Sequence, residues 1–204
     1  MSSTNRGYER HKADYYITPA NEIKNFLNEW FVDMQEEANA DPALSYIADR
    51  PDRVRWFDPC AGGSQTDPMA YPSVITKEFD AYTDTMDIRE DSLADEKADY
   101  LTTDISHRKY DVIITNPPFY LAKEIVQKAL KDVSENGYVV MLLRLNFLGS
   151  KDRFNFWQDN MPERIYVHHK RMSFTKNGGT DSIEYAHFVW QKGKTYTSSK
   201  LKVI

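Results

Sequence analysis

The stretch Asp111-Val112-Ile113-Ile114-Thr115 is followed at once by Asn116-Pro117-Pro118-Phe119. Its first five residues are rich in β-branched and apolar side chains, which is typical of a strand buried on both faces of a sheet. Two consecutive prolines cannot continue the hydrogen-bond ladder, so the strand has to end at Thr115. The sequence therefore predicts a central strand with a rigid Asn-Pro-Pro-Phe segment at its carboxyl end.

Helical and strand patterns alternate on both sides of this segment. Thr18 as an N-cap, Pro19 at the first helical position and apolar residues at helical spacing from Ile23 to Met34 predict a helix. Further elements are expected as strands at 54–57, 82–88, 100–103, 138–145, 164–169 and 183–190, and as helices at 44–48, 73–79 and 121–133. The alternation predicts an α/β sandwich with a mostly parallel seven-stranded sheet and helices on both faces. The last two strands are expected to form an antiparallel hairpin at one edge.

The composition of the 204-residue chain fits one globular domain, because 41% of the residues are hydrophobic and 13% are aromatic. A single cysteine excludes a disulfide framework and a Cys-rich zinc site. No apolar stretch reaches the roughly 20 residues of a membrane helix and no signal-peptide pattern is present, so a cytoplasmic location without membrane attachment is expected. We expect a polar arm at 1–13, one catalytic domain at 14–192 and a C-terminal tail at 193–204.

Acidic and glycine residues follow several expected strand ends, which is where open α/β sheets bind ligands. The string Asp58-Pro59-Cys60-Ala61-Gly62-Gly63 follows strand 54–57, and its glycines allow a tight turn and a close approach to a ligand. Asp87 and Asp104 stand at the ends of the next two strands. Each acid alone is equally well a solvated carboxylate or a turn former. Three acids at successive strand ends favour a binding site.

The segment 116–119 has the properties of a clamp for a planar amino group. The Asn116 side-chain oxygen and the Pro117 carbonyl can both point from a rigid backbone toward one spot in the cleft. Two acceptors can hold both hydrogens of an exocyclic amine, so that its nitrogen pyramidalises and attacks an electrophilic methyl group. Phe119 could stack on the ring that carries the amine. A simple Pro-Pro strand terminator is the alternative interpretation.

Three segments together resemble the S-adenosylmethionine-dependent amino methyltransferases, especially the DNA adenine N6-methyltransferases in a compact, phage-like form. They are Asp14-Tyr15-Tyr16-Ile17-Thr18-Pro19, residues 58–63 and residues 116–119. The resemblance implies a Rossmann-like methyltransferase fold with S-adenosylmethionine as the cofactor. It implies a catalytic role for Asn116, Pro117, Pro118 and Phe119. It implies cofactor contacts from Tyr16, Thr18, Pro19, Asp58, Pro59, Cys60, Ala61, Gly62, Asp87, Ile88, Asp104 and Asn116.

The resemblance also implies separate roles within that set. Residues 16–19 would contact the methionine part of the cofactor, and the loop 58–63 would surround the methionine and the ribose. Asp87 would bind the ribose hydroxyls and Asp104 the adenine amine. Cys60 is expected to be a small, inert loop residue, although a Pro-Cys pair also presents the nucleophile of cytosine-carbon methyltransferases. The histidines lack a metal-binding spacing, so no metal is assigned.

The chain departs from the family in two places. Ser64 stands where a further glycine is common, and the residues after Phe119 leave no room for a separate target-recognition domain. Sequence specificity is therefore open, as are a recognition partner, a homodimer and a role in restriction-modification, regulation or phage biology. RNA adenine or guanine and a protein Gln amide are alternative substrates, because both present a planar amino group. A non-catalytic subunit of a modification complex is a further alternative.

Charge is segregated along the chain, whose formal net charge is -5. This value argues against a protein that coats nucleic acids without sequence specificity, because such proteins bind by neutralising phosphates with Lys and Arg. Ten carboxylates lie between Glu78 and Asp104, whereas the interval from Arg164 to Lys176 contains four Lys or Arg residues and no acid. A basic run is often only a solvated face. As the alternative, we expect DNA contacts from Lys170, Arg171 and Lys176.

Overall fold

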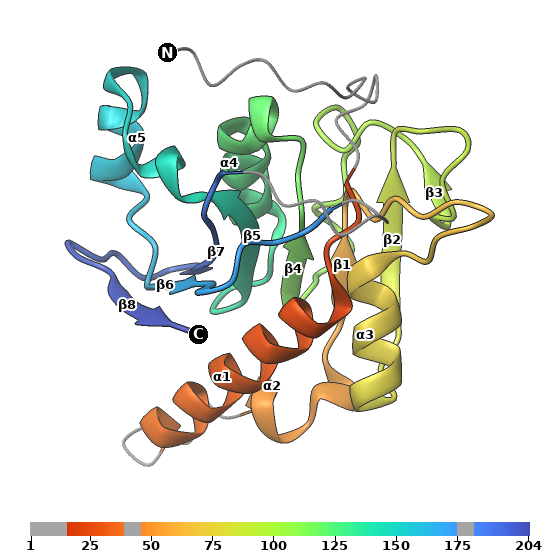
Figure 1. Cartoon of the computed structure of the whole chain (residues 1–204), viewed down its shortest axis with the longest axis horizontal. Coiled ribbons are helices and arrows are strands. Elements are labelled where there is room, and N and C mark those ends of the chain that lie inside the picture. Colours follow the sequence, from red (N-terminus) through yellow and green to blue (C-terminus); the bar gives the residue numbers. More distant parts are fainter. Residues whose placement is uncertain (1–15, 39–45, 175–181) are drawn as a thin grey trace.

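The computed structural model describes residues 16–38, 46–174 and 182–204, which fold around an eight-stranded sheet (Figure 1). The strands are β1 (Trp56–Asp58), β2 (Thr83–Asp87), β3 (Glu96–Lys97), β4 (Val112–Thr115), β5 (Tyr138–Arg144), β6 (Arg164–Val167), β7 (Tyr185–Gln191) and β8 (Lys200–Val203). The α-helices are α1 (Ala20–Ala38), α2 (Tyr46–Asp49), α3 (Ala70–Phe79), α4 (Ala122–Asp132) and α5 (Phe154–Asp159). Short 3-10 turns are η2 (Pro51–Arg53), η3 (Phe119–Leu121), η4 (Leu145–Leu148) and η5 (Lys151–Arg153).

The sheet has the strand order β3-β2-β1-β4-β5-β7-β6-β8. The five strands from β3 to β5 run parallel, and β7 is antiparallel to both β5 and β6. The chain winds outward from β1 in one direction to β3 and then crosses back to place β4 on the other side of β1. A switch point therefore lies between β1 and β4, and such points hold ligands at the carboxyl ends of the strands.

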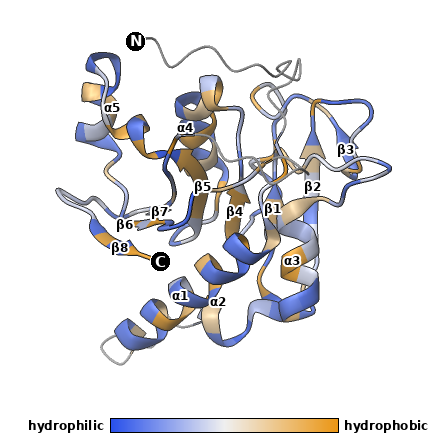
Figure 2. Ribbon diagram, viewed as in Figure 1, coloured by the Kyte–Doolittle hydropathy of each residue, from blue (hydrophilic) through white to orange (hydrophobic). Residues whose placement is uncertain are grey.

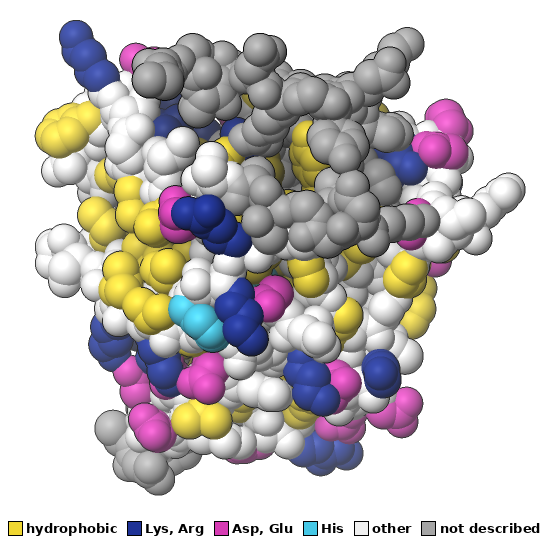
Figure 3. Space-filling view, viewed as in Figure 1, with side chains coloured by type: hydrophobic (Ala, Val, Ile, Leu, Met, Phe, Trp, Pro, Cys, Tyr) yellow, Lys and Arg dark blue, Asp and Glu magenta, His cyan; other side chains and the backbone are white. Residues whose placement is uncertain are grey.

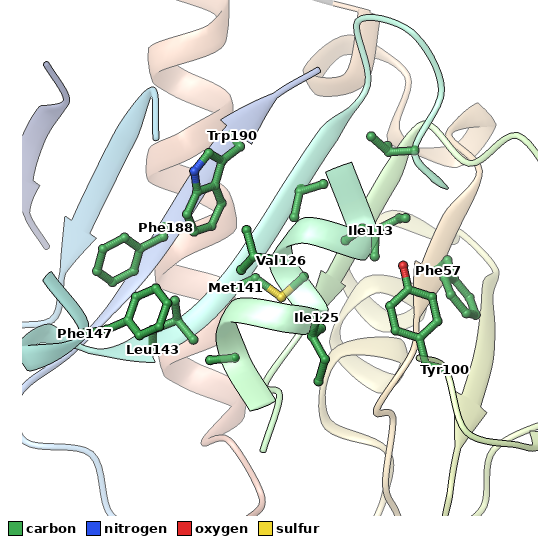
Figure 4. Close-up of a cluster of buried hydrophobic side chains, with 14 of the residues drawn as sticks. Phe57, Tyr100, Ile113, Ile125, Val126, Met141, Leu143, Phe147, Phe188 and Trp190 are labelled. Carbon is green, nitrogen blue, oxygen red and sulfur yellow. The ribbon is translucent and has the colours of Figure 1, made fainter. Parts of the chain in front are cut away.

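Apolar side chains of β4 and β5 alternate between the two faces of the sheet and build two core layers. Val112 and Ile114 face a layer shared with α1 and α3, where Trp30 and Ile75 are fully or almost fully buried. Ile113 faces the opposite layer, formed with α4 and α5 (Figure 4). Figure 2 shows β4 and β5 as the most hydrophobic ribbons at the centre of the fold. The predicted α/β sandwich with helices on both faces is confirmed.

The strand count differs from the prediction, because residues 200–203 of the expected tail form β8. This strand pairs in parallel with β6, outside the predicted hairpin of β6 and β7. Lys202 forms ion pairs with Glu29 and Asp33 of α1. Leu201 and Val203 are exposed, so β8 is held by backbone pairing and charge rather than by an apolar face. The alternating Lys-Leu-Lys-Val pattern of residues 200–203 is a strand signal that the sequence prediction overlooked.

The third strand also lies elsewhere than predicted. It is β3 at residues 96–97, and the expected strand 100–103 forms turns. The Asp99 carboxylate accepts the Leu101 N–H at 2.9 Å, and the Asp99 carbonyl accepts the N–H groups of Thr102 and Thr103. These local hydrogen bonds compete with a sheet ladder. None of the helices among the described residues is long and apolar enough to cross a membrane.

We predict that Gly137→Ala destabilises the fold by about 1–3 kcal/mol, the usual cost of overpacking. A Cβ atom at Gly137, just before β5, would lie 2.7 Å from the Asp111 carbonyl oxygen and 2.9 Å from the Ser134 carbonyl oxygen. Gly149→Ala is the matched control, because a Cβ atom there meets only one oxygen at 3.9 Å. Urea unfolding followed by circular dichroism measures both variants. Equal midpoints for the two would contradict the prediction.

Candidate active site

A cavity lies at the carboxyl ends of β1, β2 and β4, beside the switch point of the sheet. It is lined by the segment before α1, by the segments that follow β1, β2, β3 and β4, and by residues of α3 and α4. The lining residues are Tyr16, Ile17, Thr18, Asp58, Pro59, Cys60, Ala61, Ala70, Tyr71, Asp87, Ile88, Arg89, Asp99, Tyr100, Leu101, Asn116, Pro118, Tyr120, Leu121 and Ile125. Acidic and apolar side chains thus share one concave site, as in pockets for small ligands with a few polar groups.

The loop after β1 is shaped by two glycines and held by a carboxylate of β2. Gly62 and Gly63 have positive φ angles of 65° and 77°. A side chain at Gly63 would also collide with Met69, at 2.9 Å. The buried Asp87 accepts the Gly62 N–H at 2.8 Å through one carboxylate oxygen and the Arg89 N–H at 2.8 Å through the other. Asp87 therefore fixes the positions of two loops around the cavity.

Asp58, the last residue of β1, is a carboxyl group in an apolar environment. Its side chain is 1% exposed, and it accepts the Cys60 N–H at 3.1 Å. Burial raises the pKa of Asp58 to about 7, and the nearby Asp87 acts in the same direction, whereas the hydrogen bond from the Cys60 N–H opposes the shift. Burial, with Asp58 and Asp87 nearby, also raises the pKa of the Cys60 thiol. Cys60 is thus a poor nucleophile here.

Asn116 directly follows β4 and has a defined amide orientation. Its Nδ2 donates to the Tyr16 carbonyl oxygen at 3.3 Å and to Thr18 Oγ1 at 3.1 Å. Because a carbonyl oxygen only accepts, the NH2 end of the amide has to face Tyr16. The amide oxygen is left for the cavity that Asn116 lines. The segment before α1 and the Asn-Pro-Pro-Phe segment therefore meet, although they lie about 100 residues apart in the sequence.

Phe119 lies next to the cavity rather than in its lining. The Arg144 guanidinium stands 4.5 Å from the centre of the Phe119 ring, and the Tyr185 ring is tilted against it at 5.7 Å. Phe119 also packs against a small buried cluster that contains Leu142 and Met172. Pro117, its neighbour in the motif, is buried, whereas Pro118 lines the cavity.

The structure brings most of the predicted site residues together. The cavity lining includes Tyr16, Thr18, Asp58, Pro59, Cys60, Ala61, Asp87, Ile88, Asn116 and Pro118. Pro19 and Gly62 lie directly beside lining residues and support them through the backbone: the Pro19 carbonyl oxygen accepts the Ile23 N–H, and the Gly62 N–H binds Asp87. Asp104 is the exception, since it is exposed and its carboxylate binds the N–H and hydroxyl of Ser106. The structure therefore does not place Asp104 with the others.

Sequence reasoning missed several residues of the lining. Asp99, Tyr100 and Leu101 take the place expected of Asp104. Asp99 follows β3 by two residues, so an earlier boundary for the third strand would have found it. Tyr71 was also missed, because it lies in the first turn of α3 and not at a strand end, and Arg89 was missed although it directly follows the expected strand 82–88. Among the described residues, no group of three or more His, Cys, Asp or Glu side chains is placed to hold a metal ion.

Neither Lys170 nor Arg171, two of the expected DNA contacts, lines the cavity. Lys170 and Arg171 follow β6 and are exposed, and Lys176 lies outside the described residues. On the face drawn in Figure 3, the basic and acidic side chains that are coloured lie next to one another and do not form one continuous basic surface. The role of Lys170 and Arg171 stays a prediction.

Several solved structures with the same arrangement are described as methyltransferases. A proposed class I S-adenosylmethionine-dependent methyltransferase from Listeria monocytogenes matches with a TM-score of 0.60, 12% identity and 92% of this chain covered. The fold is that of the Rossmann-like methyltransferases. A type I restriction-modification methyltransferase subunit from Streptococcus thermophilus matches with a TM-score of 0.54, 11% identity and 77% of this chain covered.

A third match is an RNA methyltransferase from Salinibacter ruber in complex with S-adenosyl-L-homocysteine. It has a TM-score of 0.51 and 13% identity, and the match covers 89% of this chain and 97% of that one. In contrast, the match spans only 65% of the Listeria chain and 44% of the Streptococcus chain. No protein-family model and no curated protein sequence matches this chain.

We predict that Asp58→Asn changes how stability depends on pH. The folded pKa of Asp58, about 7, lies above its ordinary value of 3.8. The protonated carboxyl group therefore favours folding at low pH, and that contribution is lost as the pH rises through this window. Asn keeps the shape and cannot ionise. Relative to the wild type, the variant should gain up to about 1.4 kcal/mol per pH unit between pH 4 and 7.

Urea unfolding of the ligand-free protein at several pH values measures this difference. Asp159→Asn, an exposed position in α5, is the control and should follow the wild type at every pH. A constant difference between Asp58→Asn and the wild type across the window would show that Asp58 is ionised throughout.

Proposed function

We propose that this protein transfers a methyl group from S-adenosylmethionine to the exocyclic amine of adenine in DNA. The observation that carries the proposal is the orientation of Asn116 at the end of β4. Both hydrogens of its amide are engaged by Tyr16 and Thr18, which leaves the amide oxygen as an acceptor at the edge of an acidic cavity. An amine hydrogen of the target is the natural partner for that oxygen.

The cavity suits S-adenosylmethionine by the chemistry of its lining. Each Asp87 oxygen accepts one backbone N–H and keeps a further lone pair, so the carboxylate can accept two ribose hydroxyls. Asp99 is placed to accept from an adenine amine, the role that the sequence suggested for Asp104. Ile88, Leu101 and other apolar side chains line the space between these acids. The carboxylates also favour a cationic ligand over an anionic one.

The chemistry that this arrangement supports is transfer to a nitrogen of low reactivity. Bound S-adenosylmethionine supplies a methyl carbon attached to a positively charged sulfur. The Asn116 oxygen and the rigid backbone at Pro117 would hold the two amine hydrogens, which turns the nitrogen lone pair out of ring conjugation. The nitrogen then forms a bond to the methyl carbon as the carbon–sulfur bond breaks, and it loses one proton. Positioning of this kind lowers the barrier without a covalent enzyme intermediate.

The adenine substrate is inferred from the Asn116–Phe119 motif and from the match to a restriction-modification subunit. A paired adenine is unreachable within a duplex, so the base has to be flipped out or already single-stranded. RNA is the second candidate substrate, because the RNA methyltransferase from Salinibacter ruber matches over 97% of its length. A protein Gln amide offers the same kind of planar amine. Lys170, Arg171 and Lys176 are proposed to contact phosphates.

We predict that Asn116→Ala lowers methyl transfer at least about 100-fold, the scale seen when one positioned hydrogen-bonding group is removed from a reacting centre. Binding of S-adenosylmethionine, measured by calorimetry, should be largely retained. Asn155→Ala, an exposed position in α5, is the control and should keep full activity. Full activity of Asn116→Ala would refute the clamp.

The substrate itself is tested with the wild-type protein and methyl-labelled S-adenosylmethionine. Unmethylated duplex DNA, single-stranded DNA, RNA and a protein extract are offered separately, and nucleoside or amino-acid analysis then identifies the labelled product. N6-methyladenine in DNA supports the proposal. Label only in RNA or protein moves the assignment to that substrate, and no label with any of them favours a non-catalytic subunit.

We predict that Asp99→Ala weakens the binding of S-adenosylmethionine and that Asp104→Ala does not. Loss of a hydrogen bond to a charged group typically lowers affinity by about 10- to 100-fold. Asp99 lines the cavity, whereas Asp104 is exposed and bound to Ser106. Calorimetric titration of both variants makes the comparison. A loss confined to Asp104→Ala would show that the loop after β3 adopts another arrangement when the ligand is bound.

A further inference from the structure

Arg144 is the last residue of β5 and lies toward the same edge of the sheet as Asn116. β5 pairs in parallel with β4, so both strands end at that edge. The Arg144 guanidinium stands over the Phe119 ring, with 4.5 Å between its central carbon and the centre of the ring. Phe119 directly follows Pro118, which lines the cavity. Arg144 therefore lies on the side of the site where Phe119 is expected to meet the target.

The positive charge of Arg144 is not paired within the described part of the chain. None of the ion pairs among the described residues includes Arg144, and its Nε atom is buried without a hydrogen-bond acceptor there. A guanidinium stays charged and carries five N–H donors, so burying it unpaired costs free energy. By contrast, the buried Arg164 of β6 forms ion pairs with Asp33 and Glu37. Arg164 thus serves the fold, whereas the donors of Arg144 do not.

Four aromatic rings connect the cavity with Arg144. Tyr16 lines the cavity, and its ring contacts that of Phe174 with 5.9 Å between the centres. The Phe174 ring lies 4.9 Å from that of Tyr185, and the Tyr185 ring lies 5.7 Å from that of Phe119. Tyr185 is buried and pairs with Arg144 across β7 and β5. Aromatic rings and guanidinium groups are the side chains on which unpaired bases stack.

The ligand of Arg144 has to be an anion that arrives with the target. Arg144 is not among the residues that line the cavity, which argues against the carboxylate of the cofactor. A Gln amide in a protein is neutral and brings no anion at a fixed distance from its nitrogen. A nucleic acid carries one phosphate for each base, so a base that reaches Asn116 brings phosphates with it. The planar fork of a guanidinium also matches two phosphate oxygens.

We propose that Arg144 binds a backbone phosphate of a nucleic-acid target, next to the base that Asn116 holds. The inference rests on the proposed function, because it takes the target amine to lie at Asn116. It narrows the substrate to nucleic acid, in preference to a protein Gln amide. The Phe119 ring holds the guanidinium by a cation–π contact and leaves its N–H groups to donate to phosphate oxygens. Arg144 is a substrate-binding residue and takes no part in the methyl transfer itself.

The first test measures binding by fluorescence anisotropy and needs no methyl transfer. The probes are a labelled single-stranded DNA with one adenine among thymines and the corresponding RNA with uridines, each titrated at several salt concentrations. Arg144→Gln should weaken binding of the preferred probe at least about tenfold. It should also lower the slope of log K against log salt by about 0.7, the value for one phosphate contact in a single strand.

Two further variants separate charge from packing. Arg144→Lys keeps the charge, so it should keep the salt slope while it loses part of the affinity with the planar fork. Arg53→Gln removes an exposed charge before β1, at the opposite ends of the strands, and should bind as the wild type does. Urea unfolding verifies that each variant is folded. Equal losses in Arg144→Gln and Arg144→Lys with an unchanged slope would show a structural role and overturn the proposal. Wild-type affinity of Arg144→Gln, or no binding of either probe to the wild type, also overturns it.

The second test uses methylation of the single adenine, which fixes the position of the strand on the protein. Arg144→Gln should raise KM for the oligonucleotide at least about tenfold and leave kcat near the wild-type value, because the lost contact is made before and during the reaction alike. KM for S-adenosylmethionine should not change. An increase confined to KM for S-adenosylmethionine would assign Arg144 to the cofactor and overturn the proposal.

A neutral methylphosphonate, placed at each linkage near the adenine in turn, identifies the phosphate. At one linkage it should lower kcat/KM of the wild type about as much as Arg144→Gln does. Arg144→Gln should then lose nothing further at that linkage, because both changes remove the same contact. Additive losses at every linkage overturn the proposal.

The two tests distinguish this inference from the proposed function. If the wild type methylates adenine in nucleic acid and Arg144→Gln keeps its affinity and KM, the inference alone fails. If no substrate is methylated, the proposed function fails, and the binding test alone decides whether Arg144 binds phosphate.

Discussion

Parallel pairing of β1 with both β2 and β4 is the constraint on which the candidate site depends. Trp56 lies in register with Thr83 on one side and with Val112 on the other, so the three strands end at the same edge of the sheet. Asp58 and Asp87 at these strand ends, and the segment that begins at Asn116, therefore line one cavity. Layers of buried side chains cover both faces of these strands, with Ile113 in one layer and Val112 and Ile114 in the other.

The polar groups of the site are held at different energetic costs. Asp87 is buried, but its carboxylate accepts two backbone N–H groups, one from the loop after β1 and one from the loop after β2. These hydrogen bonds also fix the positions of the two loops. Asp58 is buried with fewer partners, and burial is the main cause of its raised pKa. Carboxyl groups whose pKa is strongly raised by burial cluster at functional sites. Two buried histidines, His168 and His187, are hydrogen-bonded to each other and to Glu22 and Tyr71.

Local signals in the sequence were sufficient for β4 and for the Asn116–Phe119 segment, because a β-branched apolar run and two prolines define both without help from the rest of the fold. They were insufficient for β3, which has two residues and no apolar pattern, so the acid beside the cavity was sought at Asp104 instead of Asp99. The four-residue strand β8 was also missed, although its Lys-Leu-Lys-Val sequence alternates as a strand does. The contact of Glu22 with His168 joins residues 146 positions apart, and nothing in the local pattern of either residue indicates it.

The raised pKa of Asp58 gives the cavity an adjustable charge near neutral pH. An ionisable group close to its midpoint takes up or releases a proton in response to the charge of whatever lies nearby. A cationic occupant favours the carboxylate, whereas a neutral occupant favours the acid. In the proposed reaction the sulfur loses its positive charge when the methyl group leaves, so the cavity would regain a proton as the product forms. Binding of the cationic cofactor would then release a proton from Asp58, and formation of the neutral product would return it.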